Sequence, residues 1–531
     1  MAVLAANVIY NGRRQPINSC KSYYISLIRC AKGWLCYSRR MTDTILWHDY
    51  ESFGADPRHD RASQFAAIRT DLELNEIEAP VMVYCQPPQD RWPHPMACYV
   101  TGITPQETRQ KGVCEAEFTR QIENQLSRSG TCTAGYNSIR FDDELTRQLL
   151  YRNLYDPYER EWRNGNSRWD LIDVVRMCHA LRPEGINWPT RADGAPSFRL
   201  EDLTAANGLD HLDAHDALSD VRATIAMAKL IRTQNPRLYE YTYALRRKAE
   251  VKKRLQLGSG EAVVHVASVY AAQQGCLTVV LPLVEHPLEN NGTIVFDLRF
   301  DPSPWLEESA ENLADALFRS RHEEGERLPV SVIQSNRCPM IAPLATLSAQ
   351  RAETFALDLE QVEQYRQSIL GHPGFLQRIC DAFRLRQQKQ DADRASQLIN
   401  DPDYLLYQGG FFSRKDKDFM QQVRDTDAAL LGQPGWLDDA IYDDPRLPEM
   451  LFRYRARNFP ATLNEQEADR WRQHCQERLQ NGVPGDENCL SLTAYEQAIV
   501  QLTRDMPGER AEQVASALQD WKSDLLRCLS S

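Results

Sequence analysis

The sequence predicts a multidomain protein whose first folded region is an α/β domain. At 531 residues the chain is too long for one ordinary hydrophobic core. Between residues 44 and 236, short apolar runs alternate with helical patterns, as in an α/β domain. β-rich sequence follows, and the last part is mostly helical with Pro and Gly breaks. We therefore expect domains at residues 41–236, 237–385 and 386–531.

Residues 1–40 differ from the rest of the chain in their charge. They contain seven Lys or Arg residues and no acid, whereas the whole chain carries a net charge of −12. They show neither helix caps nor a clear hydrophobic period. We expect a disordered tail or sequence upstream of a natural start at Met41. The functional alternative is a basic, acid-free transit peptide.

The first domain should alternate short strands with helices. Its expected strands are Ile45–Trp47, Val81–Cys85 and Cys132–Tyr136, and its expected helices are Asp142–Tyr151, Leu171–Leu181 and Asp216–Arg232. A charged helical stretch, Arg237–Leu255, precedes the second domain. There we expect a small barrel-like domain with strands at Ala262–Val269, Leu277–Pro282, Thr293–Leu298 and Val330–Ile333, interrupted by the helix Ser309–Arg321. Residues 384–397 are polar and Gln-rich, which predicts a linker or an exposed helix before the third domain.

Composition argues against a membrane or secreted protein. No apolar stretch approaches the roughly 20 residues that span a bilayer, and no secretory signal is evident. The 14 cysteines contain no CxxC pair, which favours free thiols in a reducing cytoplasm. The acidic net charge does not exclude nucleic acid as a substrate, because affinity for phosphate depends on where the cations cluster.

Two carboxylates follow the first apolar run. Asp49 and Glu51 are two residues apart after Ile45–Trp47, and a strand places such residues on one face. The pair can bind the hard divalent cations that prefer oxygen ligands. On its own the Asp-x-Glu pattern is common and is more often an exposed strand end.

A second acidic pair stands where a strand turns into a helix. The segment from Gly135 to Glu144 leaves the strand through polar residues and enters a helix near Asp142. Asp at a helix start is usually an N-cap. We assign Asp142 to a metal site and Asp143 to capping.

A third motif precedes the apolar helical run after residue 220. His215 and Asp220 are five residues apart, about 140° around an ideal helix. We therefore expect His215 to precede the helix and Asp220 to project from its first turns, so that both face one site. Asp216 is then the N-cap. Taken alone, a histidine here would more often be a surface or helix-end residue.

The order Asp-x-Glu, Asn-x-x-x-Phe-Asp and His-x-x-x-x-Asp resembles the DEDDh group of DnaQ-like 3′→5′ exonucleases. The flanking segments HDYESFG, DRASQFAAIRTD, TGITPQE, NSRWDLIDV and HDALSDV resemble the bacterial exodeoxyribonuclease I family. The similarity covers residues 44–460. It implies an RNase H-like exonuclease domain, an SH3-like β-barrel domain and a C-terminal α-helical domain.

The resemblance also implies the chemistry. Asp49, Glu51, Asp142 and Asp220 would hold two Mg²⁺ ions, with Mn²⁺ as a substitute, and His215 would be the base that activates water. The implied reaction releases 5′-mononucleotides from the 3′ end of single-stranded DNA, in DNA repair and recombination. The alternatives are another DEDDh nuclease that proofreads or trims RNA, and a catalytically silent single-strand-binding scaffold.

Candidate substrate contacts surround this implied site. Thr101, Gly102 and Ile103 resemble the segment beside the terminal nucleotide in related exonucleases, or they form a simple turn. Single-strand grooves combine cations with aromatic platforms. The remaining candidates, each also compatible with a structural role or already counted as a ligand, are Glu51, Arg147, Trp162, Arg182, Arg199, Arg455 and Arg457.

The family resemblance implies a monomer in the bacterial cytoplasm with one protein partner. Relatives dock the acidic C-terminal tail of single-strand binding protein on a basic ridge between the second and third domains. Here Ser348 stands where an arginine is expected after Thr346 and Leu347. Arg351 and Arg366 are the candidate replacements.

Overall fold

The computed structural model describes residues 25–30, 33–38, 43–210, 216–317, 319, 325–395, 401–433 and 441–530. The chain divides into two units, Met1–Asp43 and Thr44–Ser531. In the first unit, β1 (Ile25–Cys30) and β2 (Gly33–Ser38) pair as an antiparallel ladder. Strands are thus described within the segment that we expected to be a disordered tail, and the natural start at Met41 stays a prediction.

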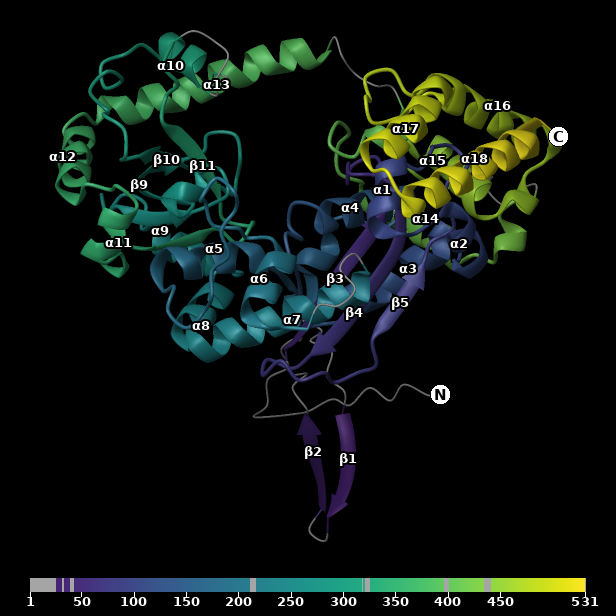
Figure 1. Cartoon of the computed structure of the whole chain (residues 1–531), viewed down its shortest axis with the longest axis horizontal. Helices are drawn as coiled ribbons and strands as arrows, with labels where there is room; N and C mark the ends of the chain where they lie inside the picture. The colour runs from purple at the N-terminus through teal and green to yellow at the C-terminus, as the bar shows by residue number, and fades with distance from the viewer. Residues whose placement is uncertain are drawn as a thin grey trace, which may run out of the picture. The chain divides into compact units, whose positions relative to one another are not determined.

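The second unit begins with a five-stranded mixed sheet (Figure 1). Its strand order is β5-β4-β3-β6-β7. β4 is antiparallel to β3 and β5, whereas β3, β6 and β7 run parallel. The strands are β3 (Thr44–Ser52), β4 (Ala62–Thr70), β5 (Val81–Tyr84), β6 (Thr131–Gly135) and β7 (Ser167–Asp170).

Strand β3 is buried on both faces of this sheet. Ile45 and Trp47 pack into one hydrophobic cluster, and Leu46 and Tyr50 pack into another, as the two-residue period of a strand requires. Asp49 follows the same two-residue period as Ile45 and Trp47, so its side chain projects from the same face of the sheet as theirs. The helices of this domain are α1 (Pro95–Thr101), α2 (Pro105–Lys111), α3 (Glu115–Leu126), α4 (Asp142–Arg152), α5 (Leu171–Leu181), α6 (Leu200–Asn207) and α7 (Ala217–Gln234).

The second sheet has five antiparallel strands in the order β11-β10-β9-β8-β12. They are β8 (Val263–Val266), β9 (Leu277–Glu285), β10 (Gly292–Asp297), β11 (Val330–Gln334) and β12 (Met340–Pro343). The expected single helical stretch before this sheet is broken into α8 (Pro236–Ala244) and α9 (Lys248–Leu255). Three helices follow the sheet: α11 (Ala349–Thr354), α12 (Leu359–Leu370) and α13 (Gly374–Ala395). The last packs beside α10 (Ala310–Ala316) (Figure 1). The polar segment from residue 384 to 395 is thus helical.

The remaining part of the chain is helical. It contains α14 (Arg414–Asp425), α15 (Leu447–Asn458), α16 (Glu465–Asn481), α17 (Leu492–Asp505) and α18 (Glu509–Ser530). Its core includes Trp471, Tyr495 and Trp521, together with Phe53 and Trp92 from the first domain. The rings of Trp92 and Tyr495 stack with their centroids 4.6 Å apart. Aromatic packing of this kind fixes the third domain against the first.

Two observations bear on the class of protein. None of the described helices combines the length and apolar character that crossing a membrane requires. Cysteines in the described part of the second unit are free thiols, and apart from Cys114 and Cys528 they are buried. Free thiols were expected from the sequence, and buried thiols behave as small apolar side chains.

Candidate active site

Strand β3 carries the first two acidic side chains. β3 pairs with β6 as far as Trp47, so Asp49 lies just beyond the end of this parallel pairing. Glu51 lies opposite Gln64 of β4, directly before a shift in register. Glu51 is 9% exposed. Two carboxylates thus lie at the C-terminal end of β3, which is the central strand of the sheet.

Asp142 reaches the same place from the start of α4. The turn that precedes it begins at Gly135, where an added Cβ would lie 2.7 Å from the carbonyl oxygen of His48. Only glycine permits this close approach. The backbone N–H of Tyr50 donates to Oδ1 of Asp142 at 3.1 Å. This hydrogen bond ties the Asp142 carboxylate to β3, between Asp49 and Glu51.

Asp220 completes the acidic group from the first turn of α7. Asp216 accepts a hydrogen bond from the backbone N–H of Ser219 at 3.1 Å and is the N-cap, as predicted. Ligand oxygens of Asp49, Glu51 and Asp220 all lie within 4.8 Å of one another. We call these three residues with Asp142 the acidic cluster. His215, the predicted base, lies outside the described residues.

The acidic cluster is electrostatically unbalanced. Burial, and then the charges of Asp142, Glu51 and Asp220, raise the pKa of Asp49 well above its usual range. Burial and the same kind of neighbours raise the pKa of Glu51 to about 9. Burial and Asp143 raise the pKa of Asp142. Carboxylates crowded in this way favour a multivalent cation, and an all-oxygen donor set suits a hard divalent ion.

Asp143 is not the predicted cap of α4. Phe141 occupies the N-cap position, and no side chain caps this helix. The Asp143 carboxylate instead accepts from Arg160 at 2.6 Å and Arg168 at 2.9 Å. Burial alone would raise the pKa of Asp143, but these two arginines hold it well below its usual range. The capping prediction was wrong because the side chain is buried beside two cations.

A cavity of about 830 Å³ opens beside the acidic cluster and includes Asp49 and Asp220 in its wall. Of the predicted substrate contacts, Arg199 lies here, with its side chain 75% exposed. Other wall residues that the sequence motifs did not indicate are Arg176, Arg191, Phe198 and Tyr270. Arg191 and Arg199 flank a loop that contains Asp193 and no further cation, so local charge did not mark Arg191 as a site residue. Tyr270 comes from the second domain, and only the fold brings it to the site.

Three predicted DNA-contacting arginines are instead buried in ion pairs. Arg147 pairs with Glu161 at 2.8 Å, and Arg455 pairs with Glu467 at 2.8 Å. Arg457 pairs with Asp403 and, at 3.5 Å, with Asp90. Arg147 and Arg455 are less than 10% exposed, and the side chain of Arg457 is 9% exposed. Their guanidinium groups already have anionic partners within the protein, which favours a structural role, and direct phosphate contacts by these side chains stay a prediction.

The other predicted contacts lie outside the wall of this cavity. Thr101 is the last residue of α1, and Gly102, with a φ of 74°, and Ile103 lie in the turn that leads to α2. Arg510 of α18 donates to the carbonyl of Val100 beside this turn. Trp162 is 64% exposed, so its indole is accessible for stacking. Arg182 donates to the carbonyl of Thr346 at 3.1 Å and thereby links the first and second domains.

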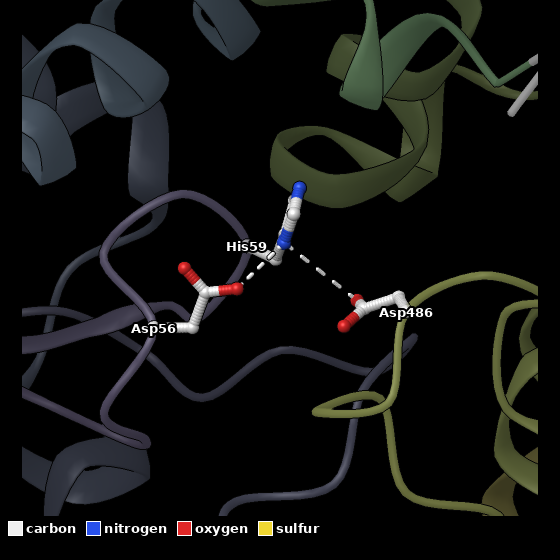
Figure 2. A group of neighbouring side chains, drawn as sticks. All are labelled: Asp56, His59 and Asp486. Atoms are coloured by element: carbon white, nitrogen blue, oxygen red, sulfur yellow. Dashed lines mark hydrogen bonds and ion pairs between the residues drawn. The ribbon is translucent and has the colours of Figure 1, made fainter. Parts of the chain in front are cut away.

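A second group of possible metal ligands lies between the first and third domains. Figure 2 shows Asp56 and His59, from the loop between β3 and β4, facing Asp486. His59 Nδ1 is 2.7 Å from Asp56 Oδ2 and 3.9 Å from Asp486 Oδ2. Asp486 Oδ2 also accepts from Arg91 and from the hydroxyl of Tyr404, each at 2.8 Å. Because Arg91 already supplies the cation, this group is better described as a polar junction between domains.

Acidic side chains gathered from one strand and two helix starts, at the end of a mixed β-sheet, define a metal-dependent nuclease with an RNase H-like domain. Family models match each of the three domains. Residues 46–228 match the exonuclease family, residues 246–385 the exonuclease I SH3-like domain, and residues 400–525 the exonuclease I C-terminal domain.

Individual relatives agree with these matches. The chain is 42% identical over 438 residues to exodeoxyribonuclease I of Escherichia coli, covering 82% of this chain and 90% of that protein. It is also 42% identical over 445 residues to exodeoxyribonuclease I of Haemophilus influenzae, covering 82% and 90%. An exonuclease I structure from Methylocaldum szegediense matches with a TM-score of 0.84 and 43% identity, covering 91% of this chain and 99% of that chain. Escherichia coli exonuclease I in complex with a dA16 oligonucleotide matches with a TM-score of 0.83 and 38% identity, covering 91% and 100%.

The chain belongs to the exonuclease I family and is an exonuclease. The predicted combination of an RNase H-like domain, an SH3-like domain and a C-terminal helical domain is confirmed.

Proposed function

We propose that the protein is a 3′→5′ exodeoxyribonuclease that hydrolyses single-stranded DNA to 5′-mononucleotides with two Mg²⁺ ions. The acidic cluster carries this proposal, because its crowded oxygens require cations and match the ligand set of two-metal phosphodiester hydrolysis. A related structure of the Escherichia coli enzyme contains single-stranded DNA and a bound zinc ion. We also propose that the protein acts as a monomer in the bacterial cytoplasm, in DNA repair and recombination.

The residues of this chain would divide the reaction between them. Asp49, Glu51, Asp142 and Asp220 hold the ions, and the N–H of Tyr50 fixes the Asp142 carboxylate. When bound, the ions would lower the pKa of water and stabilise the departing 3′ oxygen. His215, which precedes Asp216 in the sequence, would accept the proton of the attacking water. The water oxygen bonds to phosphorus as the bond from phosphorus to the 3′ oxygen breaks, so no covalent enzyme intermediate forms.

Labelled oligonucleotides test this proposal. A single strand labelled at its 3′ end should release labelled mononucleotide at once with Mg²⁺ or Mn²⁺, and the same strand labelled at its 5′ end should shorten gradually. EDTA and the Asp220→Ala variant should stop both reactions. Internal fragments, or a preference for RNA over DNA, would instead favour another type of nuclease. Binding without any cleavage would indicate a silent scaffold.

We further propose that the acidic tail of single-strand binding protein docks between the first and second domains. One related structure contains single-strand binding protein together with exonuclease I. A largely apolar cavity of about 450 Å³ lies there, with Arg182 and Arg237 in a wall that also includes Leu238 and Tyr241. Arginine beside an apolar pocket suits an acidic peptide that ends in apolar side chains.

Arg351 and Arg366, the two candidates to replace the arginine that is absent at position 348, contact groups outside this cavity. Ser348 caps α11. Arg351 donates to the carbonyls of His179 and Ala180, and Arg366 pairs with Glu363 at 2.7 Å. Titration of a fluorescent tail peptide should therefore show weaker binding by Arg237→Glu. Arg366→Glu is the matched control, and an unchanged affinity of Arg237→Glu would contradict this location.

A further inference from the structure

Asp170 lies at the C-terminal end of β7, beside the turn that leads from β6 to the proposed metal ligand Asp142. Asp170 is 1% exposed, and its backbone is in register with Gly135, the last residue of β6. We call residues 136–141, which connect β6 to α4, the β6–α4 turn. We propose that Asp170 is a positioning residue, which holds the β6–α4 turn in place and so sets the position of Asp142 among the metal ligands.

Both oxygens of the Asp170 carboxylate accept hydrogen bonds from the β6–α4 turn. The backbone N–H of Asn137 donates to Oδ1 at 2.8 Å, and that of Ile139 donates to Oδ2 at 3.1 Å. The N–H of Ile172, in the first turn of α5, also donates to Oδ1 at 3.2 Å, so Asp170 is the N-cap of this helix. Hydrogen bonds to a charged acceptor are stronger than those between neutral groups. One carboxylate thus ties the turn to the start of α5.

The conformation of the β6–α4 turn makes it dependent on this support. Asn137 has a φ of 64°, a left-handed backbone conformation that residues other than glycine adopt infrequently. The carbonyl oxygen of Ser138 accepts from the N–H of Asp143 at 2.8 Å, so the path of the turn determines where α4 begins. Without Asp170, the partly buried N–H groups of Asn137 and Ile139 would lose their acceptor, which is unfavourable. Removal of the carboxylate should therefore disturb the path of the turn.

Asp142 is held from the two strands that flank β6. The N–H of Tyr50 in β3 donates to its carboxylate at 3.1 Å, and Asp170 at the end of β7 holds the turn that precedes it. Burial and Asp143 raise the pKa of Asp142 most, and the charge of Asp170 raises it further, so Asp170 also adds negative charge that attracts cations. Groups that orient a metal ligand usually change metal affinity by about 10- to 100-fold when they are removed.

Asp173, three residues further along α5, provides a matched control. Its carboxylate lies 2.5 Å from Arg176 and 3.5 Å from the partly exposed side chain of Arg140. These described partners are arginine side chains, whereas those of Asp170 are backbone N–H groups. Asp173→Asn therefore removes a nearby negative charge without removing an acceptor from the backbone of the β6–α4 turn.

Binding of Mn²⁺ to the full chain without DNA tests this inference, which rests on the proposed function. In Asp170→Asn, an amide nitrogen, which cannot accept a hydrogen bond, replaces one carboxylate oxygen. Titration calorimetry should therefore show about 10-fold weaker Mn²⁺ binding. The Mg²⁺ concentration for half-maximal cleavage of (dT)₁₆ should rise by a similar factor, and excess Mg²⁺ should restore most of the rate. Asp173→Asn should bind Mn²⁺ as tightly as the unaltered protein.

A second variant separates positioning from helix capping. Serine is a favourable N-cap, so Asp170→Ser should still accept from the N–H of Ile172. A single short hydroxyl cannot replace two carboxylate oxygens that hold Asn137 and Ile139. Asp170→Ser should thus remain folded in urea titrations with EDTA and yet bind Mn²⁺ as weakly as Asp170→Asn.

Three results would each decide a different point. Normal Mn²⁺ affinity in folded Asp170→Asn or Asp170→Ser would overturn the inference and leave Asp170 as a helix cap. An equal loss of affinity in Asp173→Asn would also overturn it, because the loss of charge alone would then explain the effect. If the unaltered protein binds Mn²⁺ but does not cleave (dT)₁₆, the proposed reaction fails, while the Mn²⁺ affinities of the variants still decide the role of Asp170.

Discussion

Two buried groups of acidic side chains in this molecule have opposite electrostatic environments. In the acidic cluster, the charged neighbours with the largest effects on Asp49 and Glu51 are other acids, and the pKa of each is raised. The other group consists of Asp90 and Asp403, which lie among arginines of the first and third domains. Burial alone would raise the pKa of both, yet the arginines hold it well below the usual range. The arginines are Arg61, Arg453, Arg457 and Arg478.

This difference separates a site for cations from a structural junction. A buried carboxylate is stable when a protein cation neutralises it, and it then has no capacity left for a metal ion. The Asp–Arg network around Asp90 and Asp403 therefore holds two domains together. The acidic cluster has no such partner, so its negative charge is offset by protons, as the raised pKa values of Asp49 and Glu51 indicate, or by bound metal cations. Burial of a carboxylate alone does not distinguish the two roles.

The largest expected effect comes from two neighbouring residues of α4. Asp142→Asn should lower kcat by at least about 1000-fold, roughly 4 kcal/mol of transition-state stabilisation, because a ligand oxygen and its charge are lost. The folded state should be at least as stable without metal, since one repelling charge is removed. Asp143→Asn should instead lower stability by roughly 3–5 kcal/mol, because Arg160 and Arg168 lose their buried partner.

Single-turnover cleavage and urea unfolding in EDTA separate these two outcomes. Asp143→Asn should keep most of its activity at temperatures where it is folded. If Asp142→Asn were as active as the unaltered protein, or if Asp143→Asn were equally stable, the contrast between the two groups would not hold.

The second expected effect concerns acid stability. The pKa values of Asp90 and Asp403 are lowered in the folded state, so their contribution is fully present above the ordinary aspartate pKa of about 3.9 and is lost as pH falls below it. Asp403→Asn should cost roughly 3–5 kcal/mol at pH 7. It should also weaken the fall in the free energy of unfolding between about pH 4 and pH 2.

Urea unfolding at a series of pH values measures this change. Asp315→Asn is the control, because Asp315 forms an exposed pair with Lys389, and such pairs contribute little to stability. An equal acid dependence for Asp403→Asn and the unaltered protein would show that the Asp–Arg network is not the source of acid sensitivity.

The same contrast explains what the sequence could and could not predict. Asp49, Glu51, Asp142 and Asp220 were indicated by local spacing at strand and helix ends, and the structure brings Asp49, Glu51 and Asp220 within 4.8 Å of one another. Whether a charged side chain is neutralised depends on residues far away in the chain. Arg457, for example, pairs with Asp90, which lies 367 positions earlier.

The sequence did not predict secondary structure correctly where polar residues are buried in a strand. Strand β4 was not predicted, because Gln64 and Arg69 interrupt its apolar character, yet all nine of its residues are buried. Arg69 is accommodated by hydrogen bonds to Thr44, Thr131 and the carbonyl of Gln125. Such partners come from other elements, so the local pattern of apolar residues cannot show them.

The smallest expected effect concerns two arginines that the sequence treated alike. Arg199 lies in the active-site cavity with its side chain 75% exposed, whereas Arg455 is buried against Glu467. Arg199→Ala should weaken binding of single-stranded DNA several-fold and reduce the slope of log affinity against log salt by about 0.7, the value for one phosphate contact. Arg455→Ala should lower stability but leave this slope unchanged, because the Arg455 side chain is already occupied. Fluorescence anisotropy at several salt concentrations measures both slopes. If Arg455→Ala changed the slope and Arg199→Ala did not, exposure in the cavity would not identify the arginines that contact phosphates. The DNA would then have to follow a path through the third domain.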